Sequence, residues 1–287
     1  MADHPPIAED ATVTGLLAEG RRRLAGGDSP GLDAALLLAH ALGRSRTWLH
    51  TWPEHSPGAS EVEHFRALLA ARARGAPIAH LTGEREFWSL ALTVTPDTLV
   101  PRPETETLVE AALAVCPAPP ERLLDLGTGS GAVALALASE WPGTAVDATE
   151  RSHDAATLAR ENAARLGLDA RVSVFEGDWF APLPARRYPL VVSNPPYIGA
   201  EEPEPWQGDA AHEPRGALIA ADAGLAALCT IVDDAPDWLA PGGWLILEHG
   251  WRQGEAVRGL LADAGYTAVR TWRDLAGHER VTGGRRP

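Results

Sequence analysis

The stretch from residue 122 to residue 138 constrains the fold of this chain more than any other part. An apolar run over 122–126 leads into a glycine-rich turn over 127–131, and the turn leads into 132–138, whose alanines and leucines are good helix formers. Strand, glycine turn and helix form the βα unit of nucleotide-binding sheets, in which glycines allow close backbone approach and the helix N-terminus faces the ligand. We therefore expect a ligand site in a parallel sheet.

From residue 104 onward, helical and extended patterns alternate. Such alternation produces a mostly parallel sheet with helices on both faces, and ligands bind beyond the carboxyl ends of its strands. The sequence therefore predicts an α/β, Rossmann-like fold with a long loop after residue 193. The expected helices are 104–115, 131–140, 153–166, 222–240 and 254–264, and the expected strands are 122–126, 144–149, 171–175, 188–193, 243–248, 266–272 and 278–283.

The N-terminal part shows amphipathic helical patterns instead. Apolar side chains recur at helical spacing in 11–25, 31–42 and 59–74, and Gly75-Ala76-Pro77 ends the pattern. Residues 78–81 and 88–94 then resemble two short strands. We expect a helical substrate-recognition domain over 1–76, a β-hairpin-like connector over 77–100 and a catalytic domain over 101–287.

The glycine turn and the acids around it indicate the class of ligand. The spacing is Gly-x-Gly-x-Gly rather than the dinucleotide Gly-x-Gly-x-x-Gly, and no Gly-Lys-Ser/Thr follows, which argues against a P-loop. A dinucleotide stays open as an alternative. Asp125, before the turn, is placed to meet a cation or ammonium group. Glu150 ends the next strand, about 20 residues past the glycines, where a carboxylate binds ribose hydroxyls, whereas Asp147 lies within that strand.

A second motif, Asn194-Pro195-Pro196-Tyr197, follows the apolar run 188–192 and indicates the chemistry. Each proline fixes its own φ and restricts the residue before it, so the carbonyl groups point in set directions. Asn194 Oδ1 and the Pro195 carbonyl can accept the two N–H groups of an amine on an sp² carbon, with Tyr197 over its flat face. The alternative is a proline-rich turn that only closes a buried strand.

A site for an adenosyl group and a cation, beside an amine pocket, indicates S-adenosylmethionine and N-methylation. With these motifs the chain resembles the peptide chain release factor N5-glutamine methyltransferases of the PrmC/HemK type, over roughly residues 75–287. That family has a Rossmann-like S-adenosylmethionine-dependent methyltransferase sheet with a small N-terminal helical domain. The segments that carry the resemblance are 99–106, 125–131, 177–180, 193–198, 207–209, 212–214 and 247–257.

The resemblance implies S-adenosyl-L-methionine as the cofactor and the glutamine of the release-factor Gly-Gly-Gln loop as the substrate. Asp178 and Trp179 would flank the adenine. Arg102 and Glu213 would lie near the substrate entrance, although a salt bridge explains either one equally well. Many relatives use Asp where Glu150 stands. The cofactor residues are then Asp125, Gly127, Thr128, Gly129, Ser130, Gly131, Glu150, Asp178, Trp179 and Asn194, and the catalytic and substrate-binding residues are Asn194, Pro195, Pro196, Tyr197, Arg102 and Glu213.

Net charge separates the candidate substrates. The formal net charge is −14, and residues 1–77 hold eight arginines against nine acidic residues, so residues 78–287 carry about −13. A field of this sign repels phosphate backbones and attracts a basic protein loop. We therefore expect a release factor as partner and no direct nucleic-acid binding. Glutamine methylation of a ribosomal protein stays open as a close alternative, and adenine-N6 methylation of nucleic acid as a less favoured one.

The remaining signals concern metals, membranes and compartment. Cys116 and Cys229 form no Cys-x-x-Cys pair and the ten histidines are scattered, so we expect reduced thiols and no metal. The chain has neither a run of 18 apolar residues nor a basic segment followed by an apolar one at its start, so we expect no transmembrane helix and no signal peptide. We expect a cytoplasmic monomer.

Overall fold

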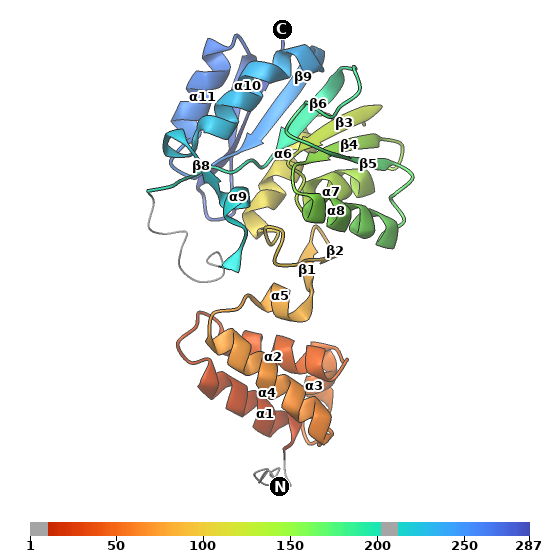
Figure 1. Ribbon diagram of the computed structural model, residues 1–287, viewed down its shortest axis with the longest axis vertical. Coiled ribbons are helices and arrows are strands. Elements are labelled where there is room, and N and C mark those ends of the chain that lie inside the picture. Colours follow the sequence, from red (N-terminus) through yellow and green to blue (C-terminus); the bar gives the residue numbers. More distant parts are fainter. Residues whose placement is uncertain (1–10, 202–211) are drawn as a thin grey trace. The chain divides into compact units, whose positions relative to one another are not determined.

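The computed structural model describes residues 11–201 and 212–287 of the chain. Contacts divide these residues into two units (Figure 1). One unit runs to Gly83 and includes His212, and the other comprises the remaining residues from Glu84 onward. The segment 207–209, which contributes to the resemblance noted above, lies outside the described residues.

The N-terminal unit is helical. Its apolar faces enclose one core, in which Leu16, Leu37 and Phe65 are almost completely buried. Close packing of the first two helices depends on Gly20, because a Cβ there would lie 2.7 Å from the Cβ of Ala34. The helices are α1 (Val13–Arg23), α2 (Pro30–Ala41), α3 (Arg46–Thr51), α4 (Ala59–Ala73) and α5 (Ile78–Thr82). Helices α1, α2 and α4 confirm the predicted helices to within two residues, and α3 was not predicted.

Helix α5 corrects the prediction of a strand over 78–81. Pro77 precedes its first turn, and Gly83 ends it in the left-handed conformation at φ 71°. Ile78 and Leu81 lie three residues apart, and both pack against the helical core. In a strand, residues three apart point to opposite faces, so the two side chains could not reach the same core. The helical unit therefore extends to Gly83 rather than ending at residue 76.

The sequence predicts a single strand over 88–94, and this prediction is wrong, because the structure has a hairpin over 84–93. It consists of β1 (Glu84–Phe87) and β2 (Leu90–Thr93), paired antiparallel. Trp88 and Ser89 form its two-residue turn with φ 51° and 60°. Such turns normally carry Gly or Asn, so the sequence contained no turn signal here. By its contacts the hairpin belongs to the second unit and is not a separate connector.

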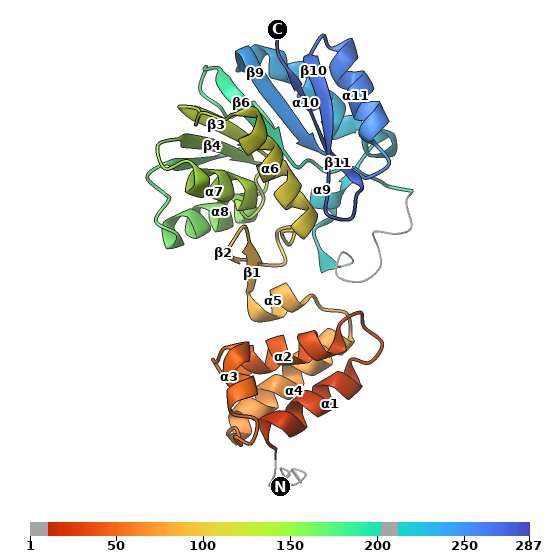
Figure 2. The ribbon, with the colours of Figure 1, turned by 180° about the vertical axis from the view of Figure 1, so that it is seen from behind.

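The second unit is built on a seven-stranded sheet, which confirms the predicted Rossmann-like α/β fold (Figures 1 and 2). The order is β10-β11-β9-β6-β3-β4-β5. The five strands from β9 to β5 in this order are parallel, and β11 is antiparallel to both its neighbours. The strands are β3 (Arg122–Leu126), β4 (Ala145–Glu150), β5 (Val172–Glu176), β6 (Tyr188–Ser193), β9 (Leu239–Glu248), β10 (Thr267–Arg273) and β11 (Glu279–Arg285).

Helices cover both faces of this sheet. Side chains of α6 (Glu106–Val115), α7 (Ala132–Glu140) and α8 (His153–Arg165) form the core on one face. Side chains of α10 (Ala226–Trp238) and α11 (Gly254–Asp263) form the core on the other. Consecutive residues of β3 alternate between the two cores, with Leu123 in the first and Leu124 in the second, as strand geometry requires.

The strand order places a ligand site between β3 and β6. From β3 the chain adds β4 and β5 on one side, and β6 and β9 on the other. The carboxyl ends of β3 and β6 therefore border the crevice in which open α/β sheets bind ligands. Short elements of the long loop and of the segment before α6 lie in the same unit: η1 (Pro103–Thr105), β7 (Ile198–Gly199), α9 (Arg215–Leu218), β8 (Ile219–Ala220) and η4 (Asp222–Gly224).

Over the described parts of the chain, none of the helices is long and apolar enough to cross a membrane.

Asn162, in α8, connects the hairpin to the glycine turn. The side chain is fully buried. Its Oδ1 accepts a hydrogen bond from the Thr93 N–H at 2.8 Å, and its Nδ2 donates to the carbonyls of Thr93 and Ser130 at 3.0 and 2.9 Å. One buried amide therefore holds the end of β2 and the glycine turn in place together.

We expect Asn162→Leu to destabilise the second unit by roughly 2–5 kcal/mol, because the Thr93 N–H and the carbonyls of Thr93 and Ser130 lose their partner. Urea denaturation of the purified protein measures this change. Glu161→Ala, at the exposed neighbouring position, is the control and should stay within about 0.5 kcal/mol of the wild type. Equal midpoints for Asn162→Leu and the control would contradict the role of the amide.

Candidate functional site

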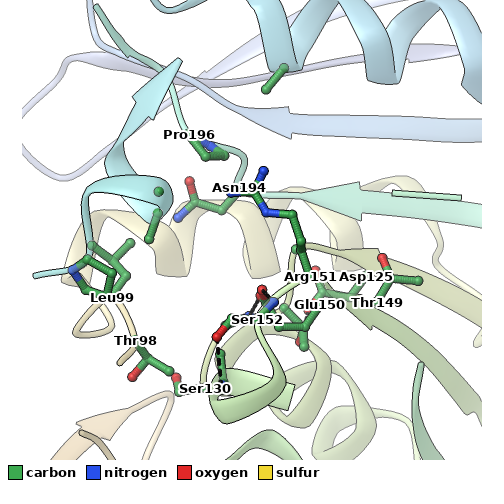
Figure 3. A pocket seen from close by; sticks show the side chains of 18 of the residues that line it. Thr98, Leu99, Asp125, Ser130, Thr149, Glu150, Arg151, Ser152, Asn194 and Pro196 are labelled. Carbon is green, nitrogen blue, oxygen red and sulfur yellow. Dashed lines mark hydrogen bonds between the residues drawn. The ribbon is translucent and has the colours of Figure 1, made fainter. Parts of the chain in front are cut away.

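A cavity of about 440 Å³ opens at the carboxyl ends of β3, β4 and β6 (Figure 3). It brings together most of the residues that the sequence singled out, although they lie far apart along the chain. Those that line it are Arg102, Asp125, Gly127, Thr128, Gly129, Ser130, Glu150, Asp178, Trp179, Asn194 and Pro196. Gly131, Pro195, Tyr197 and Glu213 are not among its lining residues.

The glycine turn makes room for the cavity through its backbone conformation. Gly127, Gly129 and Gly131 have φ of 67°, 57° and 88°, a region that side chains disfavour. At Gly127 a Cβ would lie 3.4 Å from the Trp179 ring, so a side chain there would press on the cavity wall. Gly131 is the N-cap of α7, and a Cβ there would meet Leu135 at 3.0 Å. It supports the turn from behind the cavity.

Asp125 holds the glycine turn in place through hydrogen bonds to its carboxyl group. Its Oδ2 accepts hydrogen bonds from the Thr128 hydroxyl at 2.6 Å and from the Ala134 N–H at 3.2 Å, which ties the turn and the first turn of α7 to the end of β3. The carboxyl is buried, and burial raises its pKa to about 7. A cation in the cavity would favour the ionised form of this group.

Glu150 is fixed at the end of β4. Its Oε2 accepts a hydrogen bond from the Gly129 N–H at 3.0 Å, and its Oε1 accepts one from the Ser152 N–H at 2.8 Å. Asp147, the competing acid, does not line the cavity. It is buried within β4, where Arg122, Arg186 and the Tyr188 hydroxyl reach its carboxylate at 2.7, 3.1 and 2.8 Å. Glu150 therefore lines the cavity, whereas Asp147 belongs to a structural ion-pair cluster.

Asp178 and Trp179 line the cavity after the end of β5. Trp179 has φ 42°, an uncommon conformation for a bulky residue. Its ring lies beside Gly127, as the 3.4 Å Cβ distance shows. The ring and the glycine turn therefore lie against each other in the wall of the cavity.

Asn194 follows β6 and presents its amide to the cavity (Figure 3). Its Nδ2 donates a hydrogen bond to the Thr105 hydroxyl at 3.3 Å. Its Oδ1 accepts no hydrogen bond from any residue in the described parts of the chain. The amide is therefore held at its nitrogen and has its oxygen available as an acceptor.

Tyr197 differs from the expectation that its ring covers a substrate amide. The ring packs against the core on the α10 face instead, and the hydroxyl donates to Glu248 Oε1 at 3.3 Å. The Tyr197 carbonyl accepts a hydrogen bond from Gln253 Nε2 at 3.0 Å, and a Cβ at Gly224 would lie 2.1 Å from that carbonyl oxygen. A buried hydrogen-bond acceptor behind the turn explains why the ring turns away from the cavity.

Arg102 and Glu213 form an ion pair with each other. The Arg102 guanidinium lies 2.6 Å from Glu213 Oε2, and Glu213 Oε1 accepts a hydrogen bond from the Val100 N–H at 3.2 Å. Arg102 lines the cavity, while the Glu213 side chain is fully buried behind it. Glu213 therefore holds Arg102 and its strand-like segment in place and does not itself border the ligand space.

Some lining residues were not singled out by sequence reasoning. Thr98, Leu99 and Thr105 come from the segment between β2 and α6, and Arg151 and Ser152 follow the end of β4. The Arg151 side chain reaches toward Asn194 (Figure 3), and its Nη2 would lie 3.2 Å from a Cβ on Gly216. Arg151 follows Glu150 directly, so its place after a strand end was a usable signal.

Within residues 11–201 and 212–287, no group of three or more His, Cys, Asp or Glu side chains is arranged to hold a metal ion. Cys116 and Cys229 are both free thiols and are half-buried rather than fully buried.

Comparison with known proteins identifies the family. A model of the PrmC N-terminal domain matches residues 15–83, and a model of the methyltransferase small domain matches residues 105–205. The release factor glutamine methyltransferase of Escherichia coli strain K12 is 48% identical over 269 residues, which are 94% of this chain and 97% of the relative. The chain belongs to the release factor glutamine methyltransferases. The enzyme of that name from Vibrio cholerae is 50% identical over 258 residues, 90% of each chain.

Solved structures share the fold at low sequence identity. A methyltransferase from Pyrococcus furiosus matches with a TM-score of 0.53 at 20% identity, over 75% of this chain and 95% of its own. The hMettl16 catalytic domain, in complex with the MAT2A 3′UTR hairpin 1, matches with a TM-score of 0.58 at 15% identity, over 76% and 80%. These similarities concern the fold alone, and they confirm a Rossmann-like methyltransferase sheet.

The raised pKa of Asp125 predicts how stability changes with pH. The folded chain holds this proton up to about pH 7, whereas an unfolded chain releases it near pH 4, so the group lowers stability as pH rises between these values. Asp125→Asn cannot titrate, and we expect the cofactor-free variant to lose roughly 1–3 kcal/mol less than the wild type between pH 5 and 7.5. Urea denaturation at both pH values measures the difference. Glu248, whose pKa is also raised to about 7, affects both proteins alike. Equal losses in the two proteins would contradict the prediction.

Proposed function

We propose that this protein transfers a methyl group from S-adenosylmethionine to the side-chain amide nitrogen, N5, of the glutamine in the Gly-Gly-Gln loop of a peptide chain release factor. The relatives that cover nearly the whole chain carry the name release factor glutamine methyltransferase. The observation that carries the proposal is the position of Asn194. It lines the same cavity as Asp125 and Glu150, and its Oδ1 is available to accept from a substrate amide.

The residues that line the cavity fit S-adenosylmethionine. The volume, about 440 Å³, lies within the usual range of roughly 300–1,000 Å³ for small-molecule sites. The Glu150 carboxylate can accept hydrogen bonds from ribose hydroxyls, and Asp178 and Trp179 offer an acceptor and a flat face to the adenine. The Asp125 carboxyl offers negative charge to the positively charged methionyl end. When bound, the cofactor supplies a methyl group already activated on a sulfonium.

Asn194 then orients the acceptor. A carboxamide nitrogen is a poor nucleophile, so the enzyme must place it in line with the methyl group, and orientation can contribute up to roughly 7–11 kcal/mol. Asn194 Oδ1 would accept one amide hydrogen. The second acceptor that we propose is the Pro195 carbonyl, although Pro195 is not among the residues that line the cavity. As positive charge develops on the nitrogen these acceptors bind it more strongly, so they favour the transition state over the ground state. The proton can leave to water after transfer.

The charge of the chain supports a protein substrate. About −13 of the formal net charge of −14 falls on residues 78–287. A field of this sign attracts a basic protein loop and repels a phosphate backbone, so it disfavours adenine-N6 methylation of nucleic acid. A glutamine of a ribosomal protein has the same side-chain amide, and only the choice of partner separates that substrate from a release factor.

An acceptor assay tests the proposal. The full-length protein is incubated with methyl-labelled S-adenosylmethionine and, in separate reactions, with a purified release factor, ribosomal protein and DNA. We expect label on the release factor, with mass spectrometry placing it on the glutamine of the Gly-Gly-Gln loop. Label on the ribosomal protein or on DNA, with none on the release factor, would overturn the proposed substrate.

We expect Asn194→Ala to retain cofactor binding and to lose at least about tenfold in turnover, because one acceptor for the substrate amide is removed while the adenosyl pocket remains. Steady-state kinetics with the release factor and calorimetric titration of the cofactor measure the two effects. Turnover within about twofold of the wild type would contradict the role of Asn194.

The two acids of β4 should respond differently to substitution. Glu150→Ala should weaken cofactor affinity about tenfold or more and Glu150→Asp much less, because the shorter side chain keeps the carboxylate. Asp147→Ala should instead lower stability, since it leaves Arg122, Arg186 and Tyr188 without their shared buried partner. Calorimetry and thermal unfolding of the three variants separate affinity from stability. The reverse ranking for affinity would mean that Asp147 serves the cofactor.

We further propose that the helical unit recognises the release factor away from the glutamine. Removing residues 1–83, which include α1 to α5, should then raise KM for intact release factor about tenfold or more and leave cofactor affinity within about twofold. Raising the salt concentration should reduce kcat/KM for the full-length enzyme, because screening weakens long-range attraction to the acidic catalytic unit. Equal KM values for the truncated and the full-length enzyme, both folded, would leave the helices a stabilising role only.

A further inference from the structure

Gln253, the N-cap residue of α11, has a side chain that the reaction described above does not use. Its Oε1 accepts a hydrogen bond from the Gly250 N–H at 2.9 Å, and its Nε2 donates to the carbonyls of Tyr197 and Ala223 at 3.0 and 3.2 Å. A side-chain amide has two hydrogens to donate, and here each goes to a main-chain carbonyl. One side chain therefore joins the end of the Asn194–Tyr197 turn to η4.

The Gln253 amide is fixed in one orientation. The Gly250 N–H can only donate, so it takes Oε1, and Nε2 must then face the two carbonyls. The backbone of Gln253 is anchored as well, because its N–H donates to the Gly250 carbonyl at 2.8 Å and its carbonyl accepts from the Val257 N–H at 3.0 Å. The buried ring of His249 donates from Nδ1 to the same Gly250 carbonyl at 2.9 Å. The end of β9 and the start of α11 thus form a firm support for this amide.

The segment η4 needs such a partner. Asp222, Ala223 and Gly224 have φ of 54°, 53° and 86°, a region that is unfavourable for the first two side chains. Gly224 lies against the acceptor turn, since a Cβ there would be 2.1 Å from the Tyr197 oxygen and 2.8 Å from Gln253 Nε2. Conformations of this kind persist where the surroundings hold them, and they gather at functional sites. Gln253 holds η4 through the Ala223 carbonyl.

Both segments that Gln253 joins border the cavity. Asn194 and Pro196 line it from the acceptor turn (Figure 3), and Ala221 and Ala226 line it from the two sides of η4. The same stretches also meet through β7 and β8, which pair in parallel. The hydrogen bonds of Gln253 therefore connect two parts of the cavity wall that come from different parts of the chain.

We propose that Gln253 is a positioning residue that sets where the Asn194 amide lies relative to the cavity wall around η4. Pro195 and Pro196 fix their own φ and restrict the residues before them, so the Asn194–Tyr197 turn moves as a unit. Holding the Tyr197 carbonyl therefore limits where Asn194 can lie. The inference rests on the proposed role of Asn194 and adds what holds that residue in place.

Gln253→Glu tests the role with little change of shape. One carboxylate oxygen can still accept from Gly250, but the other would face the carbonyls of Tyr197 and Ala223 and repel them. We expect kcat to fall about tenfold, because small misplacements of reacting groups are costly, while the cofactor Kd stays within about twofold. Ala256→Glu adds the same charge at an exposed position in the first turn of α11 and should keep kcat within about twofold. Wild-type kcat in Gln253→Glu would overturn the inference.

A double substitution separates positioning from a general effect on the fold. If Gln253 acts through Asn194, adding Gln253→Glu to Asn194→Ala lowers kcat by less than about twofold, because the group to be positioned is already absent. An equal loss with and without Asn194 would overturn the inference. The acceptor is whichever substrate the wild type methylates, so a wrong assignment of the release factor leaves this test intact.

Hydrogen–deuterium exchange without substrate tests the same contact independently of the reaction. In Gln253→Glu the amides of 197–199 and 222–226 should exchange faster than in the wild type, and those of β3 should not change. Unchanged exchange in both segments would overturn the inference whether or not any acceptor is methylated.

Gln253→Met supplies a second route should Gln253→Glu fold poorly, because it keeps the length of the side chain and adds no charge. It removes all three hydrogen bonds, and we expect it to lower kcat at least about threefold with the cofactor Kd within about twofold. Wild-type kcat in Gln253→Met would count against the inference in the same way.

Discussion

The hydrogen bonds to the Asp125 carboxyl are the interaction on which the site depends. Through Thr128 and Ala134 they hold the glycine turn and the start of α7 against the end of β3. The glycine turn then positions the Gly129 N–H so that it donates a hydrogen bond to the Glu150 carboxylate. Because the backbone of these glycines has positive φ, it needs an external anchor to keep one conformation, and a buried carboxyl supplies it. The geometry of the cavity beside β3 and β4 follows from this anchor.

The part of the cavity beside β6 is organised in a similar way. Buried polar groups behind β6 hold the Asn194–Tyr197 turn, through Thr105 on one side and Gln253 on the other. In each half of the site, one buried carboxyl contacts the turn: Asp125 accepts from Thr128 in the glycine turn, and Glu248 accepts from Tyr197 in the Asn194–Tyr197 turn. The strand order brings the two halves together, because β3 and β6 are neighbours in the sheet.

The strength of local signals decided how much of the structure could be predicted. The strand at 122–126 and the strand at 188–193 were predicted to the residue, because each is an apolar run bounded by glycine or proline. Helix α5 and the Trp88-Ser89 turn were missed for the opposite reason. The short segment 78–81 fits a strand as well as a helix, and the turn lacks the usual Gly or Asn. At α5 the flanking Pro77 and Gly83 act together with packing against the helical core, and at the turn packing rather than local preference selects the conformation.

The sequence by itself determined the fold class and the family, and it predicted motifs at two strand ends that the structure brings to one cavity. Glycines, prolines and capping residues act locally, so their order along the chain is sufficient to reveal these features. Only the tertiary structure decided which acid of β4 lines the cavity, that Arg102 and Glu213 pair with each other, and that the Tyr197 hydroxyl bonds to Glu248. The two pairings join side chains more than 50 residues apart in the sequence, and the choice between the acids depends on where each side chain lies relative to the sheet. Spacing along the chain does not predict such contacts.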